Sequence, residues 1–146
     1  MCNIQAALVK YKLDSSVKVS STIALSALQN SYPSSAGSLK KELIEPVIKP
    51  MLEFLQETGL YHMVNAYPFF AYSANANVIS LDYALFRNNF VVVDSGNGLR
   101  YYSILDAQIN VVFAVMSALK YDYVSLMVME IGWPSKGDKN ETWRVR

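Results

Sequence analysis

Segments with the period of a strand alternate along this chain with segments with the period of a helix, and this alternation constrains the fold most. Runs of β-branched and apolar residues predict strands at 17–24, 60–67 and 124–130. Apolar residues at helical spacing predict helices at 38–58 and 104–120. Because strands that alternate with helices are typical of parallel βαβ units, the sequence predicts an α/β fold with three parallel strands.

Shorter elements are expected between these segments. Residues 3–12 have one apolar helical face, and 80–86 has the length of a short helix. Residues 90–101 predict a strand that enters a tight turn at Gly96-Asn97-Gly98, while the Ser-, Asn- and Pro-rich residues 29–37 predict a loop. The turn lacks the spacing and the lysine of a phosphate loop, and no cofactor is predicted.

The helix at 38–58 has recognisable start and stop signals. Ser38 is a plausible N-cap, and Gly59 is placed to end the helix in the left-handed conformation. Pro46 and Pro50 fall inside the apolar stripe. Since proline removes a helical hydrogen bond, we expect a kink or a restart there.

Composition excludes several classes of function. The chain has 146 residues, 52% hydrophobic and 17% charged, which favours one folded domain over disorder. The net charge of +1 gives no basic field for nucleic acid or an anionic membrane. No apolar run reaches the roughly 18–20 residues of a membrane helix, and the amino terminus shows no signal-peptide pattern.

The residues that most often bind metals are nearly absent. Cys2 is the single cysteine and His62 the single histidine, so no disulfide and no metal site are predicted. We interpret Cys2 as incidental and His62 as a residue at a strand edge rather than a ligand or a base.

The residues 124–138 carry the strongest indication of chemistry. A short apolar run, interpreted as a strand buried on both faces, ends on Glu130 and is followed by Gly132-Trp133-Pro134-Ser135-Lys136-Gly137. Parallel α/β folds place their chemistry at the carboxyl ends of strands. Glu130 is therefore the main candidate for a catalytic residue.

This motif resembles the signature of glycoside hydrolase family 17, the plant β-1,3-glucanases and their lichenase relatives. Met129 and Ile131 depart from the pattern, because small polar residues are usual at those positions of the family. The resemblance implies an incomplete (β/α)8 TIM barrel in which 17–24, 60–67 and 124–130 correspond to strands 5, 6 and 7. It covers residues 1–138 and leaves 139–146 as a divergent tail.

A second motif supports the same alignment. Asn65-Ala66-Tyr67-Pro68-Phe69-Phe70 resembles the family's Asn-x-Tyr-Pro-Tyr/Phe-Phe element. The resemblance implies that Asn65, Tyr67 and Phe70 line the glucan cleft. Aromatic rings suit the CH faces of a sugar, and amides and hydroxyls suit its hydroxyl groups. Trp133 is either a wall of this cleft or a structural plug under the turn, and either Phe69 or Phe70 also suits a core position.

The family implies a retaining endo-1,3-β-glucanase with Glu130 as nucleophile, but the partner carboxyl group is missing from the sequence. Retention needs two carboxyl groups about 5–5.5 Å apart. No Val-Gly-Asn-Glu motif for the acid/base occurs, and the other glutamates lie on predicted helices or in the tail. These are Glu42, Glu45, Glu53, Glu57 and Glu141. The alternative is an inactive fragment that at most binds β-glucan.

The resemblance also predicts partners and surroundings. β-1,3-Glucan is the expected partner, the full-length family is expected to be monomeric, and the expected location is outside the cell or in the cell wall. Asn140-Glu141-Thr142 is an N-glycosylation sequon of the kind that often occurs by chance. Three strands cannot close a barrel, so we expect open sheet edges, an open sheet face and a chain prone to aggregation.

Overall fold

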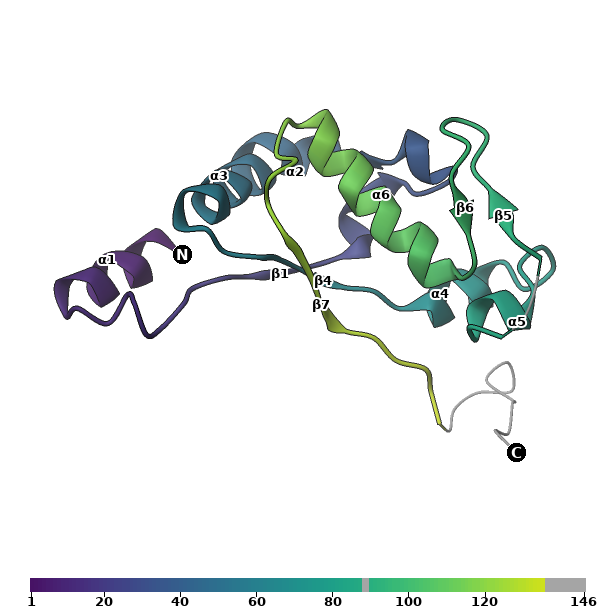
Figure 1. Cartoon of the computed structure of the whole chain (residues 1–146), viewed down its shortest axis with the longest axis horizontal. Helices are drawn as coiled ribbons and strands as arrows, with labels where there is room; N and C mark the ends of the chain where they lie inside the picture. Colours follow the sequence, from purple (N-terminus) through teal and green to yellow (C-terminus); the bar gives the residue numbers. More distant parts are fainter. Residues whose placement is uncertain (88–89, 136–146) are drawn as a thin grey trace.

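The computed structural model describes residues 1–87 and 90–135, and its centre is a parallel sheet of three strands. The strands are β1 (Thr22–Ala24), β4 (His62–Asn65) and β7 (Leu126–Glu130), in the order β1–β4–β7 (Figure 1). The predicted strands, their order along the chain and their parallel pairing are confirmed. Strand β1 is shorter than the predicted 17–24, because it lies at the sheet edge and pairs only with Met63–Asn65.

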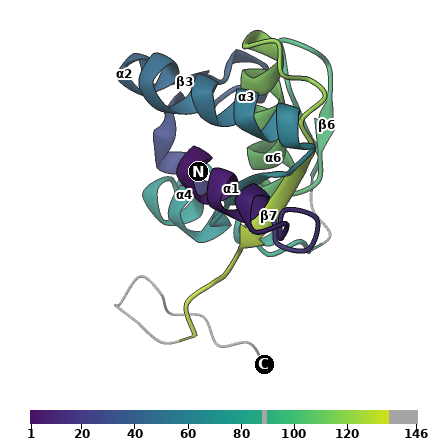
Figure 2. The same ribbon diagram turned by 90° about the vertical axis from the view of Figure 1, so that its left-hand side faces the viewer.

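Two helices cover one face of the sheet. Helices α3 (Lys49–Thr58) and α6 (Ile104–Ala118) lie on the same side of it (Figure 2). Their side chains form the main core with β4, in which Leu55 and Val64 are almost completely buried. Helix α1 (Cys2–Lys10) projects from one end and buries none of its residues (Figure 1).

The predicted helix at 38–58 is three consecutive elements. These are α2 (Lys41–Leu43), the π-helical turn η3 (Ile44–Ile48) and α3. The expected irregularity coincides with Pro46, whose missing N–H and ring interrupt the regular hydrogen-bond ladder. The prediction for Ser38 is wrong: Lys40 is the N-cap, because Ser38 pairs with Asn30 in a small sheet. Gly59 ends α3 with φ of 66°, as expected.

The long connections after β1 and β4 carry short elements of their own. The segment 29–37, predicted as a loop, contains part of a strand and a turn of helix, and 68–74 is a helix that begins at Pro68. The expected tight turn is present at 94–99, and the segments on its two sides pair as antiparallel strands, which the sequence did not predict. The bounds are η1 (Leu25–Ala27), β2 (Leu28–Asn30), η2 (Ser34–Ala36), β3 (Ser38–Leu39), α4 (Pro68–Ala74), α5 (Leu81–Ala84), β5 (Val92–Val93) and β6 (Arg100–Tyr101).

The second face of the sheet is open among the described residues. Leu126 and Val128 pack on the helices, whereas Met127 and Met129 are 37% and 48% exposed. The interpretation of β7 as a strand buried on both faces is therefore wrong for this chain. Nothing in the described ranges covers the open face, which agrees with the expected exposure of a partial barrel.

His62 lies in the central strand, not at a strand edge as predicted. It alternates with Val64 and Ala66 on the face toward the helices, and its side chain is 5% exposed. Burial lowers the pKa of His62 to about 4. It lines a cavity of about 30 Å³ whose other walls are apolar, and its Nδ1 atom has no hydrogen-bond partner.

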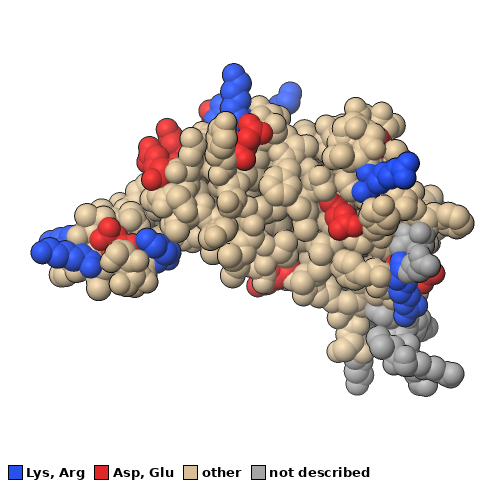
Figure 3. Space-filling model, viewed as in Figure 1, with Lys and Arg blue, Asp and Glu red and all other residues tan. Residues whose placement is uncertain are grey.

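Charged side chains are scattered over the face of the molecule that Figure 3 shows. On the face in Figure 3, lysine, arginine, aspartate and glutamate are interspersed among a larger uncharged surface. No helix within residues 1–87 and 90–135 is long and apolar enough to cross a membrane. The tail at 139–146, Glu141 and the Asn140 sequon lie outside the described residues.

Candidate active site

Glu130 is the last residue of β7, and a β-bulge determines which way its side chain faces. Val128 pairs with Val64, but the next pair is Glu130 with Asn65, so Met129 is an extra residue. A bulge of this kind reverses the alternation of side chains beyond it. Glu130 therefore shares the open face of the sheet with Asn65, while Val128 faces the helices.

Two side chains of the central strand and its extension hold the carboxylate. Nδ2 of Asn65 donates to Oε2 of Glu130 at 2.8 Å, and the hydroxyl of Tyr67 donates to the same oxygen. The residue between them, Ala66, donates its backbone N–H to the carbonyl of Glu130 at 2.9 Å. Both side-chain bonds reach Oε2, and Oε1 makes no hydrogen bond with a described residue.

The hydrogen bond also changes the chemistry of the phenol. The bond to Glu130 raises the pKa of Tyr67, with burial as a smaller cause in the same direction. Tyr67 is therefore kept protonated and acts as a donor. This pair forms because Asn65 and Tyr67 are two residues apart on an extended segment, which places both side chains on one face.

Aromatic side chains continue from Tyr67 away from the carboxylate. Pro68 occupies the first turn of α4, where proline is tolerated, and turns the chain so that Phe70 meets Tyr67 edge-on with ring centroids 5.5 Å apart. Phe70 is 64% exposed, whereas Phe69 is 8% exposed. The open choice between them is thereby decided: Phe69 is the core residue and Phe70 the surface residue.

Trp133 occupies the position of a structural plug. Its ring lies 5.2 Å from Phe69 and 5.7 Å from Tyr72, and it packs against a second hydrophobic cluster. These contacts connect the segment after β7 to α4. Since Phe69 is buried, the side of Trp133 that meets it is unavailable to a sugar.

A second catalytic carboxyl group is not found among residues 1–87 and 90–135. Strands β1 and β4 end on Ala24 and Asn65. Four of the candidate acids are exposed on the helices, and these are Glu42, Glu45, Glu53 and Glu57. No group of three potential metal ligands occurs in the same ranges.

Asp94 is a buried carboxylate that sequence reasoning assigned only to a turn. Its oxygens accept hydrogen bonds from Oγ of Ser35 at 2.6 Å, from the N–H of Ser35 at 2.8 Å and from the N–H of Gly96 at 2.8 Å. The Ser35 hydroxyl is the main cause that lowers the pKa of Asp94. All these partners are protein groups, so Asp94 joins two loops and is not a catalytic acid. Its position inside a turn motif gave no indication of this distant contact.

Two solved structures that superpose on this chain are plant glucanases. CJP38, a β-1,3-glucanase and allergen of Cryptomeria japonica pollen, superposes with a TM-score of 0.86 at 37% identity over 93% of this chain and 41% of the other. A structure from a study of two plant β-glucan endohydrolases with distinct substrate specificities gives 0.84 at 32% identity, over 94% and 44%. The fold and the site thus define part of a (β/α)8-barrel glucanase fold.

The chain belongs to the glycosyl hydrolases family 17, whose model matches residues 1–144. Glucan endo-1,3-beta-glucosidase 12 of Arabidopsis thaliana is 41% identical over 142 residues, which are 97% of this chain and 26% of that protein. Glucan endo-1,3-beta-glucosidase 14 of the same plant is 38% identical over 141 residues, or 97% and 36%. The chain therefore spans about a quarter to a third of the length of these relatives.

Proposed function

We propose that this chain carries the nucleophile side of a retaining glucan endo-1,3-β-glucosidase site, with Glu130 as nucleophile and internal β-1,3 links of a glucan as substrate. The observation that carries the proposal is the pair of hydrogen bonds from Asn65 and Tyr67 to Oε2 of Glu130. They fix the carboxylate and leave Oε1 as the oxygen that faces a reacting carbon.

In the first step, Oε1 of Glu130 attacks the anomeric carbon and forms an ester-like glycosyl-enzyme bond. The bond from that carbon to the leaving sugar oxygen breaks, and this oxygen takes a proton from a general acid. In the second step, water attacks the same carbon, gives its proton to the conjugate base and releases the Glu130 carboxylate. Asn65 and Tyr67 orient the carboxylate in both steps, because their donors remain on Oε2.

Substrate binding is assigned to the aromatic row beside the carboxylate. The exposed ring of Phe70 offers a surface for the CH face of a glucose residue, and it is fixed in place by its edge contact with Tyr67. In this proposal Trp133 packs on Phe69 and supports the aromatic row from behind, and it does not contact the sugar.

The second candidate is an inactive chain that binds β-glucan. It is favoured by one observation: no strand within the described ranges ends on a second carboxyl group that faces Glu130. The general acid of the proposed reaction must therefore come from residues beyond those described. If it is not supplied, binding through Phe70 and Tyr67 is the activity that remains.

Covalent trapping tests the nucleophile directly. The chain is incubated with a 2-deoxy-2-fluoro laminarin oligosaccharide that carries a good leaving group, which reduces the need for a general acid, and its peptides are analysed by mass spectrometry. We expect a glycosyl adduct on the peptide that contains Glu130, and none in the Glu130→Gln variant. An adduct on another residue, or equal labelling of the variant, would refute the assignment.

Reducing-sugar release from laminarin separates the two candidates. Release by the chain that is lost in Glu130→Gln supports the hydrolase. Retention on insoluble β-1,3-glucan without any release, weakened by Phe70→Ala, supports the inactive binder.

A further inference from the structure

A groove lies along α6, and its lining contains no strand of the three-stranded sheet and none of the residues around Glu130. Its volume is about 270 Å³, close to the lower end of ligand pockets at roughly 300 Å³. Asn110, Phe113 and Ser117 of α6 line one wall. They are three and four residues apart and so lie on one helix face. The buried Met116 forms part of the lining next to them, whereas Val112 belongs to the core alone.

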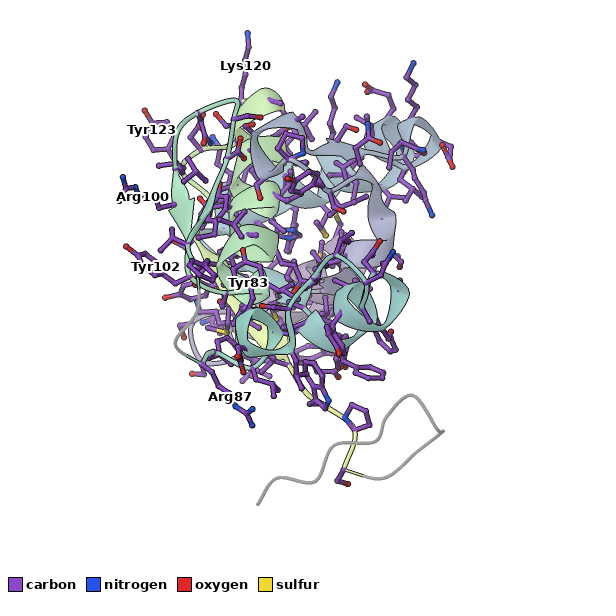
Figure 4. The ribbon with its side chains drawn as sticks, turned by 90° about the vertical axis from the view of Figure 1, so that its right-hand side faces the viewer. Tyr83, Arg87, Arg100, Tyr102, Lys120 and Tyr123 are labelled. Atoms are coloured by element: carbon purple, nitrogen blue, oxygen red, sulfur yellow. The ribbon has the colours of Figure 1, made fainter. Side chains whose placement is uncertain are left out.

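The other wall comes from two loops. Asn97 and Leu99 belong to the β5–β6 turn, and Asp122 belongs to the segment between α6 and β7. Figure 4 shows that their sequence neighbours Arg100 and Tyr123 project outward on the same side of the molecule. Three separate segments of the chain thus meet around the groove.

The groove combines apolar surface with polar groups. Phe113 and Leu99 are 46% and 49% exposed. Asparagine, serine and aspartate side chains surround them. An aromatic ring can stack on the CH face of a sugar, and amide and hydroxyl groups at the edge of the ring can bind the sugar's hydroxyl groups. This combination of side chains is typical of sugar recognition.

The two asparagines are already held in place. Oδ1 of Asn97 accepts from the N–H of Leu99 at 2.9 Å, and Nδ2 of Asn110 donates to the carbonyl of Asp106 at 2.9 Å. The Nδ2 donor of Asn97 and the Oδ1 acceptor of Asn110 therefore remain for a ligand. Neither atom bonds to a described residue. Fixed polar groups bind at a lower entropic cost than mobile ones.

We propose that this groove is a second carbohydrate-binding site, which takes one or two glucose residues of a β-1,3-glucan chain. The choice of glucan rests on the proposed function, whereas the sugar class rests on the groove itself. Asp122 lines the groove, and Arg100 and Lys120 project from adjoining segments of the chain (Figure 4), so charges of both signs occur around it, which suits a neutral polymer. A polymer held there raises the concentration of further chain segments near the sheet face that carries Glu130.

The test measures binding of the chain to laminarihexaose by NMR titration and to insoluble β-1,3-glucan by co-sedimentation. All proteins carry Phe70→Ala, which removes the exposed ring that is proposed to bind sugar at the first site. We expect shifts of the amides of Asn97, Asn110 and Ser117, and a loss of affinity of about tenfold in Phe113→Ala. Phe113→Tyr keeps the ring and is expected to bind like the parent.

Matched controls make the result decisive. Phe90 is 96% exposed and does not line the groove, so Phe90→Ala is expected to leave binding unchanged. Unchanged affinity in Phe113→Ala, or an equal loss in Phe90→Ala, would overturn the proposal and leave the role of Glu130 untouched. Shifts with cellohexaose but not laminarihexaose would overturn the choice of glucan. Loss of binding in Phe113→Ala would support this site even if the covalent trapping experiment gave no adduct on Glu130. That pair of results would refute only the proposed hydrolase function.

Discussion

Acidification from pH 7 to pH 5 is expected to destabilise the chain through His62. The side chain is 5% exposed in the central strand, and burial lowers its pKa from 6.5 to about 4. Between these two values the unfolded chain binds a proton that the folded chain does not. Stability therefore rises with pH in this window and is lost as the pH falls from 6.5 toward 4.

The magnitude follows from the two pKa values. Linkage gives a loss of about 2 kcal/mol between pH 7 and pH 5, and about 3 kcal/mol when the window is crossed completely. The walls of the cavity beside His62 are apolar and offer no carboxylate to a charged imidazole. They are Ile23, Ala24, Leu25, Ala27, Leu28, Leu39, Ile48, Leu52, Val64, Val112, Val115 and Met116.

The assay is urea unfolding followed by circular dichroism at pH 5, 6 and 7. Because His62 is the only histidine, no other side chain has an ordinary pKa between pH 5 and pH 7. The control is His62→Phe, which does not titrate and whose ring can use the neighbouring cavity. We expect this variant to keep nearly constant stability over the same range. Equal stability of the parent at pH 5 and 7, or an equal loss in the variant, would refute the reasoning.

Three further predictions concern the same unfolding measurement. Asp94→Asn is expected to lower the free energy of unfolding at pH 7. Because the pKa of Asp94 is lowered in the folded chain, the difference in stability between variant and parent should shrink as the pH falls below about 4. A difference that does not depend on pH would contradict this prediction. Leu55→Ala is expected to cost about 3 kcal/mol, since Leu55 is 0% exposed, and a loss below about 1 kcal/mol would mean that the core collapses around the gap. Gly59→Ala is expected to cost about 1 kcal/mol because φ is 66°, whereas a gain would show that the helix end rearranges.

The helices and strands that depend on the spacing of apolar residues, and the helix end that depends on a glycine, could be predicted from the sequence. The stripes of α3 and α6, the three strands and the stop at Gly59 each depend on neighbouring residues, and all are present. The prediction for His62 is wrong, since this residue lies in the central strand of the sheet. Its alternation with Val64 and Ala66 already indicated the buried face.

Features that depend on two distant segments could not be predicted. The bonds between Ser35 and Asp94 join residues 59 positions apart, and the sequence around each is that of an ordinary turn. The pairing of Asn30 with Ser38 displaced the expected helix cap in the same way. Such contacts are selected by the packing of whole loops, which no local pattern records.

The direction of Glu130 belongs to this second group, and it changes how Met129 should be interpreted. In a strand of strict alternation, Glu130 would share the helix-facing side with Val128, and the carboxylate would lie away from Asn65. The extra residue at Met129 corrects this, and the hydrogen bonds to the carboxylate come from Asn65 and Tyr67, not from the residues beside it. The number of residues between Val128 and Glu130 therefore determines where the carboxylate points, whichever side chain stands at 129. The departure from the family pattern at this position leaves the geometry of the candidate nucleophile intact.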